Sequence, residues 1–245
     1  MKGRSALIVV LTGLAAWSLV LGCDRIPGKP TEAQRPLLSS QMSNFDDLYG
    51  RSCAGCHGGD GQLGAARPLR DPLYLVLVHR DTLWQIIAQG VPGTTMPAFS
   101  DRFGGGLTDK QIDILIDGMQ NRWGRPQAFT HVALPPYSLA DARAAGAEPG
   151  DAERGKTAYT TYCVHCHGPE GRGGEQGGAV VEGAYLALVS DQALRTAVIA
   201  GRLDLGMPDW RANIAGRPMS PQEISDVVAW LASHRPVAPI ASKSK

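Results

Sequence analysis

The most regular patterns of apolar residues along the chain have the period of a helix. In segments 107–120 and 219–232, apolar side chains recur three and four residues apart, so each segment has one apolar face. These faces consist of Ile112, Leu115, Ile116 and Met119 in the first segment and of Ile224, Val227, Val228 and Leu231 in the second. Alternating patterns typical of strands are nearly absent, and the sequence therefore predicts an all-α fold.

Both segments begin with a recognisable start signal. Thr108 with Gln111, and Ser220 with Glu223, have the spacing of capping boxes, in which each side chain bonds the backbone of the other residue. A further helix is expected to begin near Asn44, whose side chain can cap it. We interpret these residues as structural.

A different apolar run lies at the start of the chain. Lys2 and Arg4 precede a mainly apolar stretch at 6–21, which is typical of an export signal and shorter than the about 20 residues of a spanning helix. The stretch ends in LVLGC, which resembles the lipobox of bacterial lipoproteins. The resemblance implies a signal peptide at 1–22 and a lipid on Cys23, and Asp24 favours retention in the inner membrane. An uncleaved anchor with an incidental cysteine is the alternative, and both place the rest of the chain outside the cytoplasm, on the periplasmic side of a bacterial membrane.

Three motifs occur twice, in the same order. CAGCH at Cys53 returns as CVHCH at Cys163, 110 residues later. The stretch around Met96 returns around Met207 at an offset of 111, and the helical segment described above returns at an offset of 112. A repeated order with nearly constant spacing indicates a duplicated domain.

The repeats divide the chain into two domains, which we place at 44–123 and 151–236. The stretch 124–150 is rich in Pro, Ala and Gly and is predicted to be a linker. Residues 23–43 are predicted to form a lipid-anchored tether, and 237–245 a C-terminal tail.

The Cys-x-x-Cys-His motif is typical of covalent c-type haem attachment. Cysteines at i and i+3 lie on one face of a helical turn, where their thiols can bond to two vinyl groups on one porphyrin edge. The next residue, His57 or His167, can then reach the iron. We therefore predict two covalently bound haem c groups, attached through the cysteine pairs Cys53 and Cys56, and Cys163 and Cys166.

Three other uses of the cysteines compete with haem attachment. A zinc site in either repeat needs two further ligands at sensible spacing, and a redox dithiol is expected near a βαβ pattern, which is missing. A disulfide between cysteines three residues apart is rare and strained. The five cysteines of the chain are all assigned, one to the lipid and four to the repeated motifs.

The haem-binding stretches CHGGDGQLG and CHGPEGRGG, with GTTMPAF and LGMPDW downstream, are similar to those of class I cytochrome c domains. The resemblance covers roughly 44–122 and 151–235. It implies an all-α fold around each haem. It also implies the axial iron ligands, which are His57 and Met96 in the first repeat and His167 and Met207 in the second.

The resemblance also implies a proline about eleven residues after each haem histidine, whose carbonyl accepts the imidazole N–H. Pro68 fits this pattern, and the second repeat has no such proline, so we expect that hydrogen bond in the first repeat only. The remaining candidates are interpreted as core or surface residues; they are Met119, Met219, His79, His131, His165 and His234.

Composition adds two limits. The chain is 43% hydrophobic and 19% charged, with a formal net charge of +1 and no basic stripe, so no nucleic acid is expected among its partners. Without Lys2 and Arg4, 22 basic residues stand against 23 acidic ones, which describes a nearly neutral mature protein.

An iron held by both histidine and methionine has no open position, so its expected chemistry is outer-sphere electron transfer. Two such domains predict a membrane-anchored diheme cytochrome that relays single electrons in a respiratory or photosynthetic chain, and not an enzyme. Its expected partners are a membrane oxidoreductase complex, a soluble electron carrier, and the membrane itself through the N-terminal lipid. A diheme enzyme of the peroxidase or thiosulfate-oxidising type, and a subunit whose haems carry no current, remain as alternatives.

Overall fold

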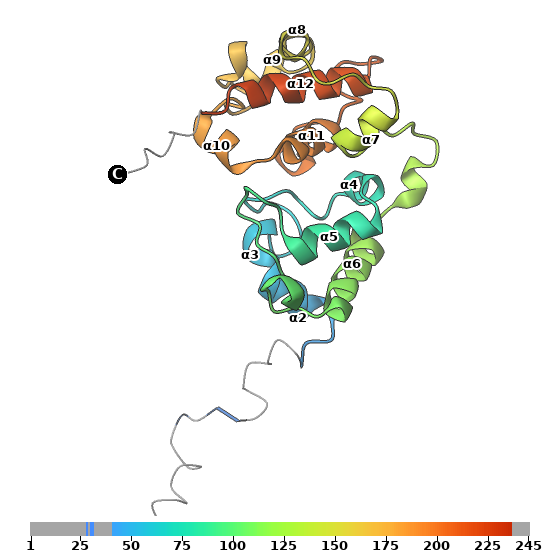
Figure 1. Cartoon of the computed structure of the whole chain (residues 1–245), viewed down its shortest axis with the longest axis vertical. Helices are drawn as coiled ribbons and strands as arrows, with labels where there is room; N and C mark the ends of the chain where they lie inside the picture. Colours follow the sequence, from blue (N-terminus) through green and yellow to red (C-terminus); the bar gives the residue numbers. More distant parts are fainter. Residues whose placement is uncertain (1–27, 29, 32–40, 237–245) are drawn as a thin grey trace, which may run out of the picture. The chain divides into compact units, whose positions relative to one another are not determined.

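The computed structural model describes residues 28, 30–31 and 41–236, and its contacts divide the chain into Met1–Gln41 and one compact unit, Met42–Lys245 (Figure 1). The predicted signal peptide, the predicted lipid on Cys23, most of the tether and the tail at 237–245 lie outside the described residues. No helix within the described part of the chain is long and apolar enough to span a membrane.

The all-α prediction is confirmed for the described residues, in which two isolated β-bridges are the only extended pairings. The first repeat contains α2 (Phe45–Ser52), α3 (Ala54–His57), α4 (Pro72–Leu77), α5 (Arg80–Gln89), η4 (Asp101–Phe103) and α6 (Asp109–Trp123). The second contains α8 (Ala152–Tyr162), α9 (Val164–His167), η6 (Pro169–Gly171), α10 (Gly183–Leu188), α11 (Asp191–Ala200), η7 (Leu203–Leu205) and α12 (Pro221–Ser233). Between the repeats lie η5 (Pro126–Phe129) and α7 (Leu139–Ala144).

The predicted helix starts are confirmed. The Asn44 side chain accepts a hydrogen bond from the backbone N–H of Asp47, at 2.9 Å, and caps α2. Thr108 and Ser220 each form a complete capping box at the start of α6 and α12. Such a cap typically contributes about 1 kcal/mol, because it satisfies backbone N–H groups that have no partner within the helix.

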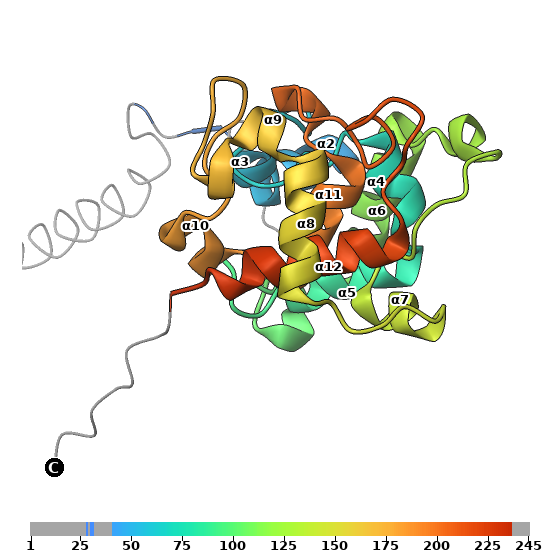
Figure 2. The same cartoon turned by 90° about the horizontal axis from the view of Figure 1, so that it is seen from above.

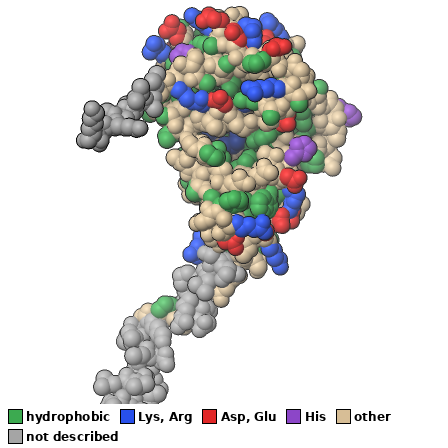
Figure 3. All heavy atoms as spheres, viewed as in Figure 1, with side chains coloured by type: hydrophobic (Ala, Val, Ile, Leu, Met, Phe, Trp, Pro, Cys, Tyr) green, Lys and Arg blue, Asp and Glu red, His purple; other side chains and the backbone are tan. Residues whose placement is uncertain are grey.

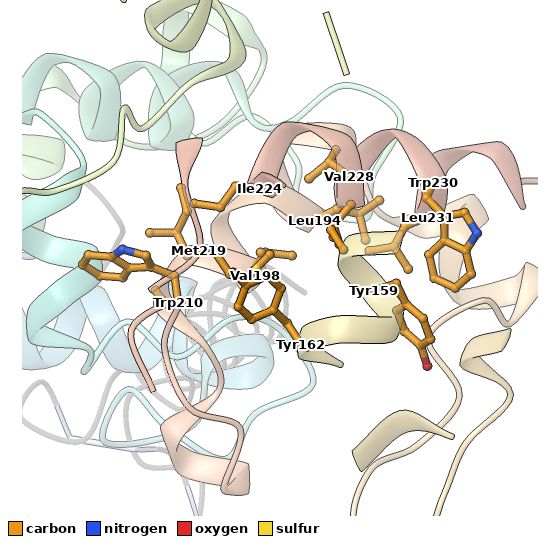
Figure 4. Packing of buried hydrophobic residues seen from close by; sticks show 14 of the residues in the cluster. Tyr159, Tyr162, Leu194, Val198, Trp210, Met219, Ile224, Val228, Trp230 and Leu231 are labelled. Atoms are coloured by element: carbon orange, nitrogen blue, oxygen red, sulfur yellow. The ribbon is translucent and has the colours of Figure 1, made fainter. Parts of the chain in front are cut away.

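The apolar faces predicted for the last helices are buried. On α6, Ile112 and Ile116 are fully buried, and on α12 the exposure of Val227 and Val228 is 1%. Figure 4 shows the core of the second repeat, where side chains from α8, α11 and α12 meet. Each buried aliphatic side chain contributes about 1.5–3 kcal/mol, which makes these faces the main support of both repeats.

The first helix of each repeat packs across the last one, and the two crossings differ in detail. Figure 2 shows α8 crossing α12. In the first repeat the ring of Phe45 on α2 covers Gly118 of α6, where an added Cβ would lie 2.0 Å from the ring. In the second repeat Gly155 of α8 lies against α12 beside Trp230, and its Cβ would lie 2.0 Å from the Asp226 carbonyl oxygen. In the first repeat the large residue lies on the first helix and the glycine on the last, whereas in the second repeat the glycine lies on the first helix and the large residue on the last.

Helix α4 packs into both repeats. Leu73 and Leu77, four residues apart, belong to the core of the second repeat, whereas Tyr74 and Val78 belong to that of the first. Helices α4 and α11 are in contact, and Figure 1 shows them side by side where the repeats meet. The two repeats therefore share an apolar wall, which explains why they form one unit.

The predicted linker is fixed to the second repeat by a buried arginine. Arg195 on α11 is fully buried and donates hydrogen bonds to the carbonyls of Pro136 and Tyr137 and to the Ser225 hydroxyl. Burial lowers the pKa of Arg195, and Asp141 opposes that shift. Breaking these contacts would leave a buried charge without partners, so this part of the linker is held firmly.

Charged side chains on the surface are paired rather than segregated. Arg80 contacts Asp113 and Asp117, and Arg122 contacts Asp46. On the face seen in Figure 3, acidic and basic side chains are intermixed. This arrangement matches the small net charge of the chain.

Candidate haem sites

In each repeat, the predicted attachment cysteines, histidine and methionine line a single cavity. They are Cys53, Cys56, His57 and Met96 in the first repeat, and Cys163, Cys166, His167 and Met207 in the second. The first cavity has a volume of about 110 Å³ and the second about 340 Å³. The fold thus brings each methionine to the motif from which it is separated by about 40 residues in the chain. Their roles as ligands stay a prediction.

Both histidine rings are oriented by a backbone carbonyl. His57 Nδ1 donates to the Arg67 carbonyl at 2.7 Å, and His167 Nδ1 donates to the Gly178 carbonyl at 2.8 Å. Because a carbonyl can only accept, the proton lies on Nδ1, and Nε2 keeps the lone pair that a metal needs. Burial lowers the pKa of His57 and so favours the neutral ring. The hydrogen bond to the Arg67 carbonyl opposes this shift but does not cancel it.

The expectation that only the first repeat would have a hydrogen bond from the haem histidine to a loop carbonyl is wrong. The second repeat has an equivalent bond without a proline, because any loop carbonyl at that position can accept it. In the first repeat the acceptor is the carbonyl of Arg67, the residue before Pro68, rather than that of Pro68 itself.

Two of the four motif cysteines are largely buried. Burial raises the pKa of the Cys53 and Cys163 thiols to about 12, and the neighbouring Cys56 and Cys166 add to each shift. None of the four forms a disulfide. Within the described residues, no three His, Cys, Asp or Glu side chains are grouped as metal ligands, so the zinc alternative lacks its ligand set.

Two glycines that were not among the predicted site residues position the methionine loops. Gly90 and Gly201 follow α5 and α11 with φ of +70°, in a region that is open essentially to glycine alone. An added Cβ would lie 2.6 Å from the Met96 carbonyl oxygen at Gly90, and 2.5 Å from that of Met207 at Gly201. A signal was present, since each glycine lies in a repeated stretch before a Met-Pro pair.

The residue after each glycine closes the loop. The backbone N–H of Val91 donates to the Met96 carbonyl at 3.1 Å, and that of Arg202 donates to the Met207 carbonyl at 3.0 Å. The same bond at equivalent positions gives both methionines the same backbone support.

A tyrosine supports each motif from the preceding helix. The Tyr49 hydroxyl donates to the Gly58 carbonyl at 2.9 Å, and the Tyr159 hydroxyl donates to the Gly168 carbonyl at 2.6 Å. Burial raises the pKa of both tyrosines, to about 12 for Tyr159, so both keep their protons and remain donors. Their common place, four residues before the first cysteine, was a signal that the sequence analysis missed.

The linings of the two cavities differ in polarity. Leu69, Leu83 and Leu115 line the first, whereas Gln176 and Asn213 contribute amides to the second. Each cavity also has one arginine that is paired with a carboxylate; the pairs are Arg67 with Asp71 and Arg202 with Asp204.

The other candidates lie as expected. Met119 and Met219 are core residues, each 2% exposed, and Met119 also contributes to the wall of the first cavity. The four remaining histidines are exposed and line neither cavity; they are His79, His131, His165 and His234.

These residues fit a covalently attached haem. Each cavity presents two thiols, an imidazole whose Nε2 is not used by the hydrogen bond to the loop carbonyl, a thioether sulfur and mainly apolar walls. That donor set matches the chemistry of haem c ligation.

Comparison with known proteins supports the same assignment. Residues 152–235 match the family model Cytochrome c, and residues 40–117 match the model Cytochrome C oxidase, cbb3-type, subunit III. Both models describe c-type cytochromes and together they cover both repeats.

Two curated relatives are similar to most of this chain. A cbb3-type cytochrome c oxidase subunit CcoP of Azospirillum sp. strain B510 is 28% identical over 66% of this chain and 48% of its own length. The CcoP of Azospirillum brasilense is 26% identical over 85% of this chain and 65% of its own length. This chain therefore spans about half to two thirds of the relatives it matches.

A solved structure was also found. The reducing HAO-like protein complex Kustc0457/Kustc0458 of Kuenenia stuttgartiensis is 16% identical, with a TM-score of 0.43, over 82% of this chain and 100% of the matched chain. Similarity at this level does not establish a common fold.

Proposed function

We propose that this chain, which consists of two cytochrome c domains, binds two covalent haem c groups and relays single electrons between redox partners of a respiratory chain. One observation carries the proposal. In each repeat the histidine and the methionine line the same cavity as the two cysteines, as two axial ligands and two attachment points require.

The geometry of the two cavities supports a role for each of the predicted residues. Cys53, Cys56, Cys163 and Cys166 would attach the haems, and the irons would be held by His57 with Met96 and by His167 with Met207. The bound haem supplies the one-electron Fe(III)/Fe(II) couple, whose potential methionine ligation raises. The carbonyls of Arg67 and Gly178 hold the imidazoles in the binding tautomer, and the apolar walls limit access of water. With both axial positions taken, the chain itself has no site for a substrate and acts as a carrier, not an enzyme.

We propose a terminal oxidase complex as the partner. Similarity to CcoP, named as a subunit of cbb3-type cytochrome c oxidase, supports this placement over a photosynthetic one. In this proposal, the domains at 44–123 and 151–236, joined by the linker at 124–150, face the periplasm. A lipid on Cys23, after removal of residues 1–22, attaches the tether at 23–43 to the inner membrane.

The ligation is tested by spectroscopy of the full chain matured with haem. We expect two haems per chain and two equivalents of the weak red absorption band of methionine-ligated ferric haem. Met96→Leu and Met207→Leu should each remove one equivalent, whereas the controls Met119→Leu and Met219→Leu should keep both. One missing equivalent in the unaltered protein, together with peroxide turnover, would establish the enzyme alternative instead.

The partner is tested by purification in mild detergent from the source membrane. Oxidase subunits are expected to copurify with the chain, and haem reduction within that complex should keep pace with oxygen consumption. A Cys23→Ser variant should leave the membrane fraction if the lipid is the anchor. If the haems stayed oxidised while the complex consumed oxygen, they would not take part in electron transfer, and the relay proposal would be wrong.

A further inference from the structure

Arg67 is bonded to both repeats at once. Its backbone carbonyl accepts the Nδ1 proton of His57 in the first site. One guanidinium nitrogen donates to Asp71 at 3.1 Å, and the other donates to the carbonyls of Thr196 at 2.9 Å and Gly201 at 3.3 Å in the second repeat. The partners in the second repeat are 129 and 134 residues away in the chain.

The second end of this connection lies at the methionine loop of the second site. Gly201, which accepts from Arg67, lies so close to that loop that its Cβ would be 2.5 Å from the Met207 carbonyl oxygen. Arg67 therefore links the histidine of one site to the backbone beside the methionine of the other.

Helices α4 and α11, which are in contact, each contribute side chains to one of the two cavities. Tyr74 of α4 lines the first cavity, and Leu194 and Val198 of α11 line the second. The Arg67 guanidinium lies 5.0 Å from the centre of the Tyr74 ring, within cation–π range. A further bond crosses nearby, from the Leu63 N–H to Asp204 at 3.3 Å.

The charge of Arg67 is held in a largely buried pair. The exposed fractions of the Arg67 and Asp71 side chains are 17% and 6%. Removing one partner from such a pair leaves an uncompensated buried charge, which then acts strongly on its neighbours.

We propose that Arg67 is a positioning residue that couples the two haem sites, setting their relative placement for electron exchange and raising the potential of the first. This rests on the proposed function, because it requires two redox-active haems on the chain. With Arg67 in place, its cation compensates the Asp71 carboxylate. Without Arg67, the uncompensated buried carboxylate would favour the ferric form, which carries the larger positive charge, and would lower the reduction potential of the first site. The two carbonyl contacts hold α11 and its loop against the first site.

The test is Arg67→Gln in the full, haem-loaded chain, with redox titration of both haems and flash-induced exchange between them. Haem content and both methionine bands should be retained. The first-site potential should fall by roughly 59 mV, which corresponds to a tenfold shift of a one-electron equilibrium. Exchange between the haems should slow about tenfold, which corresponds to a barrier higher by about 1.36 kcal/mol.

Two variants serve as controls. Arg70→Gln removes the same charge from the same loop, but Arg70 is half-exposed and pairs with the exposed Asp60, so both quantities should stay unchanged. Arg67→Lys keeps the charge without the planar fork, and should restore the potential while leaving exchange slow. If Arg67→Gln does not fold, Arg67→Lys is compared with Arg70→Gln in its place.

The proposal is overturned if Arg67→Gln or, failing that, Arg67→Lys matches Arg70→Gln in both potential and exchange rate. Failure of the proposed function would look different, since the unaltered chain would then lack two redox-active haems.

Discussion

The first cavity, of about 110 Å³, is lined mainly by apolar side chains and has no amide among the described residues, whereas the lining of the second, of about 340 Å³, includes two amides. The bonds that support the predicted ligands are nevertheless the same in both. Each imidazole donates to a loop carbonyl, and each methionine carbonyl accepts from the residue after a glycine. The comparison shows that the backbone framework survived duplication, while the side chains that set polarity diverged.

The helix crossings point to the same conclusion. Phe45 over Gly118 in the first repeat corresponds to Gly155 beside Trp230 in the second, at offsets of 110 and 112 residues. One large and one small residue fill each crossing, but the helix that contributes the large one has changed. Close packing constrains the summed volume at the crossing more than the identity of either residue.

The largest effect is expected from overfilling these crossings. Gly155→Leu should cost about 3 kcal/mol of unfolding free energy, because its Cβ meets the backbone of α12, which cannot rotate away. Gly118→Leu should cost about 1–2 kcal/mol, since the Phe45 ring can turn. Urea unfolding followed by circular dichroism measures both. Gly50→Leu, with nothing within 4 Å, should change little, and equal costs at all three positions would contradict the packing argument.

The methionine loops are the next target. Gly90→Ala and Gly201→Ala should each weaken one methionine band. Each substitution introduces about 1–3 kcal/mol of backbone strain, and the added Cβ also clashes with the backbone of the methionine loop. Gly93→Ala and Gly206→Ala are matched controls, because both have positive φ but nothing within 4 Å. If the controls lose the bands equally, strain alone explains the effect and the close approach is irrelevant.

The difference in polarity should appear in the potentials. We expect the first site to have the higher potential, because an apolar surrounding disfavours the more highly charged ferric form. Gln176→Leu with Asn213→Leu should raise the second-site potential by on the order of 60 mV, a tenfold change in the one-electron equilibrium. Redox titration of each haem decides this, and a higher second-site potential in the unaltered chain would be inconsistent with it.

The smallest effect concerns acid stability. Burial raises the pKa of Asp226, but hydrogen bonds from Arg154, the Asp151 N–H and Gln222 outweigh burial, and the pKa lies below its ordinary value of 3.8. A carboxyl with a lowered pKa stabilises the fold above that ordinary value and loses its contribution as the pH falls through the folded pKa. Unfolding of the second repeat should therefore be more acid-sensitive than that of the first, where Ile114 takes the equivalent place.

Asp226→Asn tests this directly. The variant should be less stable than the unaltered chain at neutral pH, and the gap should narrow below pH 3.8. If the difference in unfolding free energy stayed constant across that pH range, ionisation of the Asp226 carboxyl would not contribute to stability.

Local rules of sequence determined much of this protein. The helical period placed the buried faces of α6 and α12, the capping residues marked their starts, and the repeated spacing identified the four cysteines, two histidines and two methionines that are among the residues lining the two cavities. These features depend on residues a few positions apart, or on repetition, and both can be read directly from the chain.

Only the tertiary structure decided what crosses between distant segments. The path of a loop brings the Gly178 carbonyl to His167. The docking of the repeats places α4 in both cores and brings the Arg67 side chain to the Thr196 carbonyl. No local pattern encodes them, because any backbone carbonyl can accept a hydrogen bond and its position is set by the whole fold.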